Sequence, residues 1–269
     1  MNDRKKNNFQ NTALLEINGI SKSFGGVHAV RTVSFSLMPG SITGLIGPNG
    51  AGKTTLFNLI TGVLPPDCGN VVFDGRTTHH TKIHKLVHRG ISRTFQNVEL
   101  FESMTVLENV LVGQYTQTHC GMWGSILRLP WVLQEERQAR QKSMELLEFV
   151  GLESFADNLS SDLPFGWQRL LELARALAAK PKLLLLDEPA AGLNIVETTQ
   201  LGQLINKVRA SGISVLLVEH DMSLTMEISD KIVVLDQGSK IAEGPPREIQ
   251  ANDAVIKAYL GTGRESTGT

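Results

Sequence analysis

The chain has 269 residues, which is enough for one or two domains of about 150 residues each. Hydrophobic residues make up 41% and charged residues 20%, so a globular core can be buried. The 27 acidic and 26 basic residues give a formal net charge of −1, which argues against a protein held to nucleic acid by bulk positive charge. This balance still allows a small, concentrated anion site.

The cysteines and the apolar segments further limit the class of protein to which the chain can belong. Cys68 and Cys120 lie far apart without a CxxC partner, so we expect reduced thiols of a cytosolic protein. The first eleven residues are polar and no apolar signal region follows them. Two long windows without charged residues, 32–52 and 109–127, contain too many polar and turn-forming residues to form a membrane helix. We therefore predict a chain that does not span a membrane.

Short apolar runs alternate with helical patterns along the chain, which is typical of a parallel sheet flanked by helices. The alternating segments 14–20 and 32–38 predict a smaller antiparallel sheet near the N-terminus. Buried strands are predicted at 41–46, 183–186, 214–219 and 232–235, where apolar residues are nearly continuous. Helices are predicted at 53–61, 135–150 and 253–260. No structure is predicted for 114–130.

Between Gln96 and Leu163 the strand patterns stop, which indicates a helical insertion within the α/β core. The sequence therefore predicts four segments. They are the first part of the core (12–95), the helical subdomain (96–164), the second part of the core (165–250), and a C-terminal helix with its tail (251–269).

A glycine-rich segment follows the first predicted buried strand and matches G-x-x-x-x-G-K-[ST]. This phosphate loop consists of Gly47, Pro48, Asn49, Gly50, Ala51, Gly52, Lys53, Thr54 and Thr55. Its glycines let successive N–H groups face one concavity, and the following helix directs its positive dipole end there. Lys53 supplies a cation for the β- and γ-phosphates, and the Thr54 hydroxyl can bind Mg²⁺. The segment predicts a nucleotide site.

Two adjacent acids follow the run of four leucines at 183–186. Asp187 stands at the tip of a predicted buried strand, where a carboxylate can hold Mg²⁺ beside a phosphate loop. Glu188 points the opposite way and can reach an attacking water as a general base. The alternative is that the two acids only cap the next helix.

Histidines at 80, 84 and 88 recur at helical spacing, with His79 adjacent. That spacing can bind a metal ion. The neighbouring cations Lys82, Lys85 and Arg89 favour the alternative of a solvated basic surface helix.

The segment 163–169, Leu-Pro-Phe-Gly-Trp-Gln-Arg, precedes the acidic strand and resembles the signature of ATP-binding-cassette (ABC) ATPases. This resemblance implies a P-loop NTPase (RecA-like) α/β fold, with a parallel-sheet core, a small antiparallel β subdomain and an inserted α-helical subdomain. It covers about 14–261. It also implies that the signature segment binds ATP held by a second cassette, through residues Leu163, Pro164, Phe165, Gly166, Trp167 and Gln168.

The resemblance assigns three further residues. Phe24 would stack on adenine, Gln96 would contact Mg²⁺ and the membrane partner, and His220 would contact the γ-phosphate. The predicted catalytic residues are Glu188 and His220. The predicted metal ligands are Thr54, Gln96 and Asp187. Two departures stand out: Pro164 replaces the usual serine, and the segment after Asp187-Glu188-Pro189 ends in asparagine instead of aspartate.

Several short motifs are similar to those of the ATPases of branched-chain amino-acid importers. They are 93–97 (Arg-Thr-Phe-Gln-Asn), 187–194 (Asp-Glu-Pro-Ala-Ala-Gly-Leu-Asn), 219–222 (Glu-His-Asp-Met) and 258–261 (Ala-Tyr-Leu-Gly). The last motif and the insertion at 114–130 resemble the larger ATPase subunit of that system. Urea-type importers share much of this pattern and stay open as an alternative.

The sequence therefore predicts an ATPase with ATP and Mg²⁺ as cofactors, peripheral on the cytoplasmic face of the inner membrane. Its expected partners are a second cassette (itself or a paralogue), two permease subunits and, indirectly, a solute-binding protein, with no nucleic acid. An ATPase subunit does not contact the transported solute, so its sequence does not identify that solute. A soluble ABC ATPase outside transport and a nucleotide sensor with little turnover stay open as well.

Overall fold

The computed structural model describes residues 13–79, 81–94, 96, 98–115, 130–219 and 222–261. The chain divides into two compact units: the first ends at Ile83 and resumes at Ile205, and the second is His84–Leu204. In chain order the second unit is thus inserted in the first. The four-segment division drawn from the sequence has other boundaries and stays a prediction.

The first unit contains an antiparallel sheet with the strand order β2-β1-β4-β5. Its strands are β1 (Leu15–Phe24), β2 (Val27–Leu37), β4 (Cys68–Phe73) and β5 (Arg76–Thr77). Leu15 pairs with Leu37 and Ile17 with Phe35, and all four side chains are buried. Alternate residues thus face the core, as the period of two requires. The antiparallel sheet expected near the N-terminus is confirmed.

The first unit also contains parallel strands, with β3 (Ile42–Ile46) hydrogen-bonded to β8 (Ser214–Val218) and β9 (Lys231–Asp236). A fourth strand, β10 (Ser239–Gly244), runs antiparallel to β9. Every residue of β3 and β8 is buried, as expected for strands covered on both faces.

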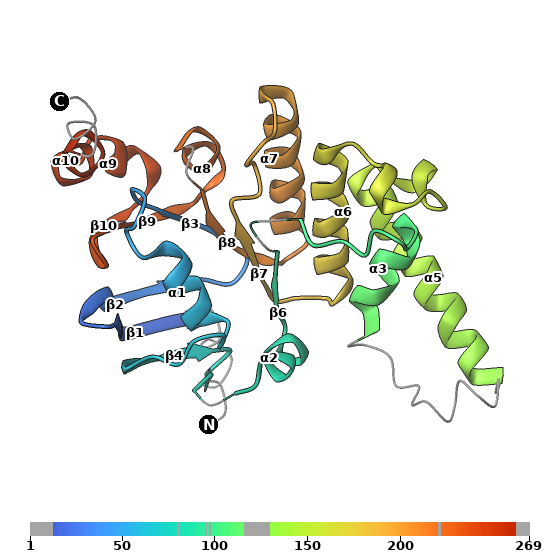
Figure 1. The fold of residues 1–269 in the computed structure, drawn as a ribbon, viewed down its shortest axis with the longest axis horizontal. Helices are drawn as coiled ribbons and strands as arrows, with labels where there is room; N and C mark the ends of the chain where they lie inside the picture. The colour runs from blue at the N-terminus through green and yellow to red at the C-terminus, as the bar shows by residue number, and fades with distance from the viewer. Residues whose placement is uncertain are drawn as a thin grey trace, which may run out of the picture. The chain divides into compact units, whose positions relative to one another are not determined.

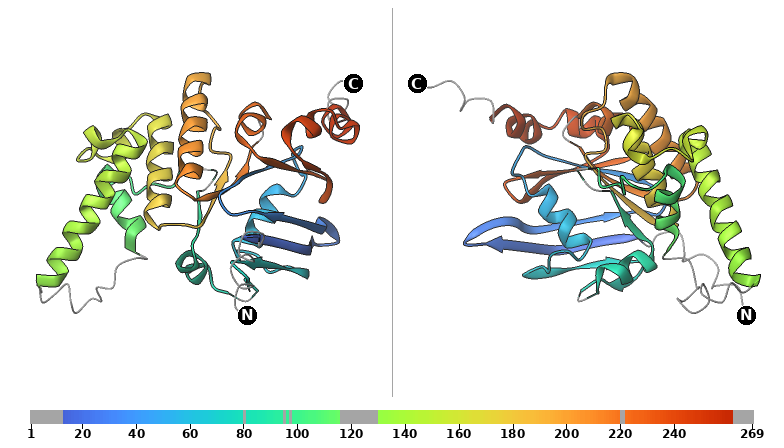
Figure 2. Two further views of the ribbon diagram at one scale, coloured as in Figure 1. Left: turned by 180° about the vertical axis from the view of Figure 1, so that it is seen from behind. Right: turned by 45° about the vertical axis from the view of Figure 1, so that its right-hand side comes forward.

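Helices of the first unit cover both sides of β3. They are α1 (Lys53–Ile60), α8 (Met222–Ile228), α9 (Pro246–Gln250) and α10 (Asp253–Gly261). Figures 1 and 2 show α1 on the side of the antiparallel sheet, and α8, α9 and α10 on the other. Ile249 and Val255 from these last helices join Ile46, Ile232 and Val234 in one buried cluster. The C-terminal helices are therefore part of the core that holds the end of β3.

The second unit contains two parallel strands, β6 (Ile91–Arg93) and β7 (Leu183–Asp187). Its helical elements are α2 (Ile83–Arg89), α3 (Val106–Gln114), α5 (Pro130–Val150), η2 (Glu153–Phe155), η3 (Ser160–Asp162) and α6 (Phe165–Ala178). The next helix, α7 (Ile195–Ala210), crosses the boundary at Leu204. Strand β6 was not predicted, because three residues carry too little periodicity to be recognised.

Three helices of the second unit pack together, α3 with α5 and α6, and α5 with α6 (Figure 2). The capping box of Thr105 and Glu108 starts α3, and each side chain accepts from the other's backbone N–H. The buried Gln114 amide donates to the Ser143 hydroxyl at 2.7 Å and so joins α3 to α5. Within the described residues, no helix combines the length and apolar character needed to cross a membrane.

Candidate functional site

The phosphate loop joins β3 to α1 in the first unit, and its glycines are required by the backbone. Gly52 is the N-cap of α1 with φ of 98°, in the left-handed region that favours glycine. A Cβ there would lie 2.3 Å from the carbonyl oxygen of Ala29. Gly47 is equally confined, since a Cβ would lie 2.2 Å from the carbonyl oxygen of Leu235. Both positions exclude a side chain.

Lys53, the first residue of α1, is folded back over the phosphate loop. Its ammonium donates to the carbonyl oxygens of Gly47 at 2.6 Å and Pro48 at 3.1 Å, and the residue is buried. Asn49, Gly50 and Thr54 are exposed in the same loop. The lysine thus lies against loop carbonyls, while Thr54 and the tip of the loop are exposed.

An exposed aromatic ring, that of Phe24, ends β1. The Lys22 ammonium lies 5.6 Å from the centre of that ring and 2.7 Å from Asp67. Hydrogen bonds from Lys22 and from the Ser23 backbone lower the pKa of Asp67. The position suits a ring that accepts a planar ligand, and adenine stacking on Phe24 stays a prediction.

Tyr259 of α10 contacts the phosphate loop, which sequence reasoning missed. Its hydroxyl is hydrogen-bonded to the backbone of Gly47, and its ring packs against the cluster around Ile46. Burial raises the pKa of Tyr259 to about 12, although the Gly47 hydrogen bond works in the opposite direction. Two sequence signals marked Tyr259, its place in the motif 258–261 and its i, i+4 spacing from Val255 on a predicted helix, and neither predicts the contact with Gly47.

Asp187 ends β7 in the second unit and is buried beside a cation. The Arg93 guanidinium, from β6, lies 2.6 Å from its Oδ2. The Arg93 and Asp187 side chains are only 12% and 4% exposed. Carboxylate, hydroxyl and amide oxygens are hard donors of the kind Mg²⁺ takes, usually with one or two carboxylates, waters and phosphates. Asp187 and Gln96 in the second unit, and Thr54 in the first, each carry an oxygen of this kind, and their binding of Mg²⁺ stays a prediction.

Glu188 has a strained backbone, with φ of 48°, which is uncommon for a residue with a side chain. Its Oε2 accepts a hydrogen bond from the Gln96 amide at 2.9 Å. Arg169 in turn donates to the Gln96 carbonyl at 2.7 Å and lies 3.6 Å from Glu172. Gln96, Glu188 and Arg169 thus form one network, and the sequence predicted only the first two as functional residues.

The signature segment forms the first turn of α6, with Pro164 as its N-cap. Leu163 is buried, and its carbonyl accepts from the Gln168 amide at 3.0 Å. Phe165 and Trp167 are exposed, and the Trp167 ring lies 4.6 Å from that of Phe155. The Glu197 carboxylate of α7 crowds Gly166, where a Cβ would lie 2.8 Å from its Oε1.

The predicted site residues divide between the two units. Phe24 and the phosphate loop belong to the first, whereas Gln96, Asp187, Glu188 and the signature segment belong to the second. His220 lies outside the described residues, as does His80. His84 and His88 are exposed on α2, and no group of three or more potential metal ligands is found among the described residues.

Comparison with known proteins identifies the class. A model of the ABC transporter family matches residues 30–191, which include the phosphate loop, the signature segment and Asp187. A model described as branched-chain amino acid ATP-binding cassette transporter matches 239–265, which include Tyr259. The chain belongs to the ATP-binding proteins of ABC transporters.

Two curated relatives share nearly their whole length with the chain. BraF of Pseudomonas aeruginosa, a high-affinity branched-chain amino acid transport ATP-binding protein, is 44% identical, over 92% of this chain and 98% of BraF. LivG of Escherichia coli, with the same description, is 43% identical over the same shares.

Solved structures give the same fold. A nucleotide-free ATP-binding cassette from an ABC transporter matches with a TM-score of 0.80 and 33% identity, over 92% of this chain and 99% of that one. The ADP conformation of the cassette MJ1267 matches with a TM-score of 0.81 and 33% identity, over 93% and 99%. The expected cassette fold is confirmed.

Proposed function

We propose that the chain is the ATP-hydrolysing subunit of a branched-chain amino-acid importer. The observation that carries hydrolysis is Glu188, which is held on a strained backbone directly after the buried Asp187 and hydrogen-bonded to Gln96. Strain of this kind costs about 1–3 kcal/mol and is concentrated at active sites. The names of the relatives BraF and LivG support the choice of branched-chain amino acids.

Each predicted residue has a role in this proposal. The backbone N–H groups of the phosphate loop and Lys53 bind the phosphates, Phe24 stacks on adenine, and His220 contacts the γ-phosphate. Thr54, Gln96 and Asp187 would hold Mg²⁺, which neutralises phosphate charge when bound. Glu188 accepts a proton from the attacking water. Catalysis is therefore mainly positioning and charge stabilisation.

The signature segment would contact nucleotide held by a second cassette. Exposed apolar side chains lie there and at the start of α7, namely Phe165, Trp167, Ile195 and Val196. Exposed apolar groups of this size favour a protein interface over solvent. A solved relative, the bacterial cassette MJ0796, is described as dimeric; it is 26% identical with a TM-score of 0.74, over 87% of this chain and 99% of that one.

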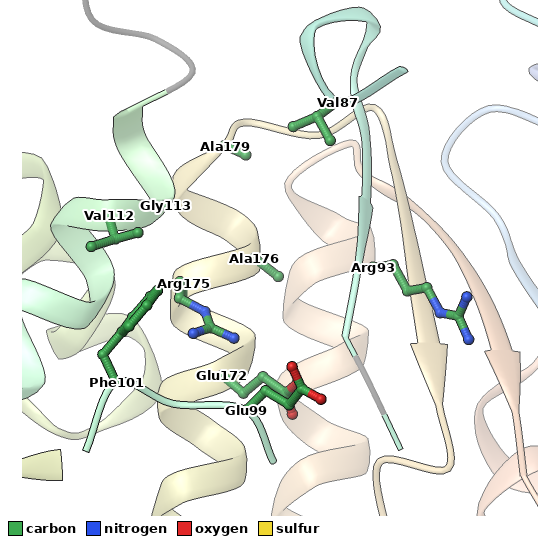
Figure 3. Close-up of a pocket in the computed structure, with 10 residues that line it drawn as sticks. All are labelled: Val87, Arg93, Glu99, Phe101, Val112, Gly113, Glu172, Arg175, Ala176 and Ala179. Carbon is green, nitrogen blue, oxygen red and sulfur yellow. The ribbon is translucent and has the colours of Figure 1, made fainter. Parts of the chain in front are cut away.

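A groove in the second unit suits a permease segment (Figure 3). The Arg175 guanidinium lies 5.8 Å from the centre of the exposed Phe101 ring, beside Glu99 and Glu172. Burial lowers the pKa of Arg175, and the two carboxylates oppose this shift. The groove thus offers an apolar surface beside carboxylates, to which we assign a cytoplasmic loop of the permease. This docking would hold the chain at the cytoplasmic face of the membrane.

Substitution of Glu188 tests the hydrolytic role. Glu188→Gln should lower steady-state ATPase activity by about 10²–10⁴-fold, because it removes the general base. Binding of a fluorescent ATP analogue should stay within about twofold of the unsubstituted protein, a difference of ~0.4 kcal/mol. Glu148→Gln, an exposed acid on α5, is the matched control. Equal ATPase rates for Glu188→Gln and the control would contradict the assignment and favour a nucleotide sensor.

The transported solute is tested with the complete transporter. The permeases and solute-binding protein that co-purify with the chain should support ATP-dependent uptake of leucine into proteoliposomes. Uptake of urea instead of leucine would favour the urea-type alternative.

A further inference from the structure

A cation already occupies the carboxylate that we assign to the metal ion. Arg93 Nη2 lies 2.6 Å from Asp187 Oδ2, in a pair that is almost completely buried. A buried, charge-assisted contact of this length is strong, and a buried carboxylate without a partner is expensive. Arg93 therefore supplies the buried Asp187 carboxylate with a charged hydrogen-bond donor in this structure.

The position of Arg93 follows from the register of two strands. β6 and β7 are parallel, and Arg93 lies opposite Leu185, two residues before Asp187. The hydrogen bond from Thr94 N–H to the Leu185 carbonyl, at 3.0 Å, fixes this register beyond the end of β6. A long side chain from Arg93 then reaches the end of β7, where Asp187 stands. The sheet itself thus brings the guanidinium to the carboxylate.

We propose that Arg93 is the resident counter-ion of Asp187 and that it competes with Mg²⁺, so that metal binding releases the guanidinium. The proposal rests on the proposed function, in which Asp187 is a metal ligand. Arg93 weakens metal binding in two ways while it stays in place. It competes with Mg²⁺ for Oδ2, and its positive charge repels the metal ion. Arg93 is thus a positioning residue and not a catalytic one.

Arg93 also belongs to the groove assigned to the permease. It is one of the residues that line this groove, and Figure 3 shows its guanidinium directed away from Phe101 and Arg175. One side chain therefore spans from the groove to the predicted metal ligand. Its release on metal binding would alter the wall of that groove.

The test measures the Mg²⁺ dependence of nucleotide binding, not turnover. A fluorescent, non-hydrolysable ATP analogue is held at fixed concentration and titrated with Mg²⁺. Arg93→Met, which keeps an unbranched apolar side chain and removes the charge, should lower the half-saturating Mg²⁺ concentration about tenfold, as a lost competitor worth ~1.4 kcal/mol predicts. Arg93→Lys, which keeps a cation, should stay closer to the unsubstituted protein.

Matched variants separate the possible results. Arg140→Met breaks an exposed pair with Asp157 and should leave the half-saturating Mg²⁺ concentration unchanged. Asp187→Asn should abolish the Mg²⁺ response, alone and combined with Arg93→Met. An unchanged or higher half-saturating concentration in Arg93→Met would overturn the counter-ion role. A normal Mg²⁺ response in Asp187→Asn would instead overturn the metal assignment.

A measurement on the unsubstituted protein covers the case in which Arg93→Met does not fold. Side-chain ¹⁵N spectra of arginine, assigned with Arg93→Lys, should show slow rotation of the Arg93 guanidinium without ligand. Rotation should become faster when the nucleotide analogue is added with Mg²⁺, but not when it is added alone. A guanidinium that stays immobilised with Mg²⁺ would contradict the release.

Discussion

Tyr259 is a single residue through which the C-terminal helix contacts the phosphate loop. Its hydroxyl is hydrogen-bonded to the Gly47 backbone, and burial raises its pKa to about 12, above the ordinary value of 10.0. The folded state therefore favours the neutral phenol. The resulting contribution to stability is complete below pH 10 and is lost as the pH rises from 10 to about 12.

Tyr259→Phe should remove this pH dependence, because phenylalanine cannot ionise. We expect the urea midpoint of the unsubstituted protein to fall more steeply between about pH 9 and about pH 12 than that of Tyr259→Phe. Tyr115→Phe removes the other tyrosine, which is exposed, and should keep the steep fall. Parallel curves for Tyr259→Phe and the unsubstituted protein would contradict the burial of an un-ionised phenol.

Single residues also mark the limit of sequence reasoning. Gly47, Lys53 and Asp187 could be singled out because a short motif or a buried strand identifies them locally. The partners of these residues could not, since Tyr259 and Arg93 are distant in sequence and meet them only through tertiary packing. Arg93 was recognised as part of a motif, yet no pattern in the sequence predicts that its guanidinium pairs with Asp187.

At the scale of elements, the departure at Asn194 has a local explanation. Asn194 Oδ1 accepts from the Glu197 N–H at 3.0 Å, and Glu197 Oε2 accepts from the Asn194 N–H at 2.9 Å. This reciprocal pair is a capping box at the start of α7. Asparagine and aspartate are about equally good in that role, so the replacement preserves the start of the helix.

Asn194→Ala should therefore destabilise the protein by about 1 kcal/mol, and Asn194→Asp by much less. Urea denaturation, with the slope of the transition held equal, measures both values. If Asn194→Asp were as destabilising as Asn194→Ala, a contact of the amide NH₂ group outside the cap would have to explain the loss.

The predicted elements differ in how well the sequence determined them. Continuous apolar runs identified β3, β7, β8 and β9, because a strand buried on both faces needs apolar residues at every position. The helix predicted at 135–150 begins five residues earlier, at Pro130, in the structure. Short β6 was missed, although it supplies Arg93.

At the scale of the whole molecule, assembly with a second cassette should depend on the exposed start of α7. Ile195 and Val196 are 87% and 66% exposed, which is costly for apolar side chains unless a partner covers them. Ile195→Asp would place a charge in that interface, and Ile195 is not itself one of the predicted nucleotide ligands. It should therefore weaken association and leave nucleotide affinity unchanged.

Mass photometry of Glu188→Gln with Mg-ATP measures this association. Adding Ile195→Asp should weaken the dimer at least about tenfold, equivalent to ~1.4 kcal/mol. Val63→Asp, at an exposed apolar position of the first unit, is the matched control. Equal dimer populations in the two double variants would place the interface elsewhere on the chain.

Trp167 gives the protein a natural optical reporter. The indole lies in the first turn of α6, is 37% exposed and packs on Phe155, and it is one of three tryptophans in the chain. Replacing Trp123 and Trp131 with phenylalanine would leave it as the single emitter. Any partner that covers the signature segment would remove water from the indole and shift its emission to shorter wavelength, so closure could be followed in real time without an attached dye.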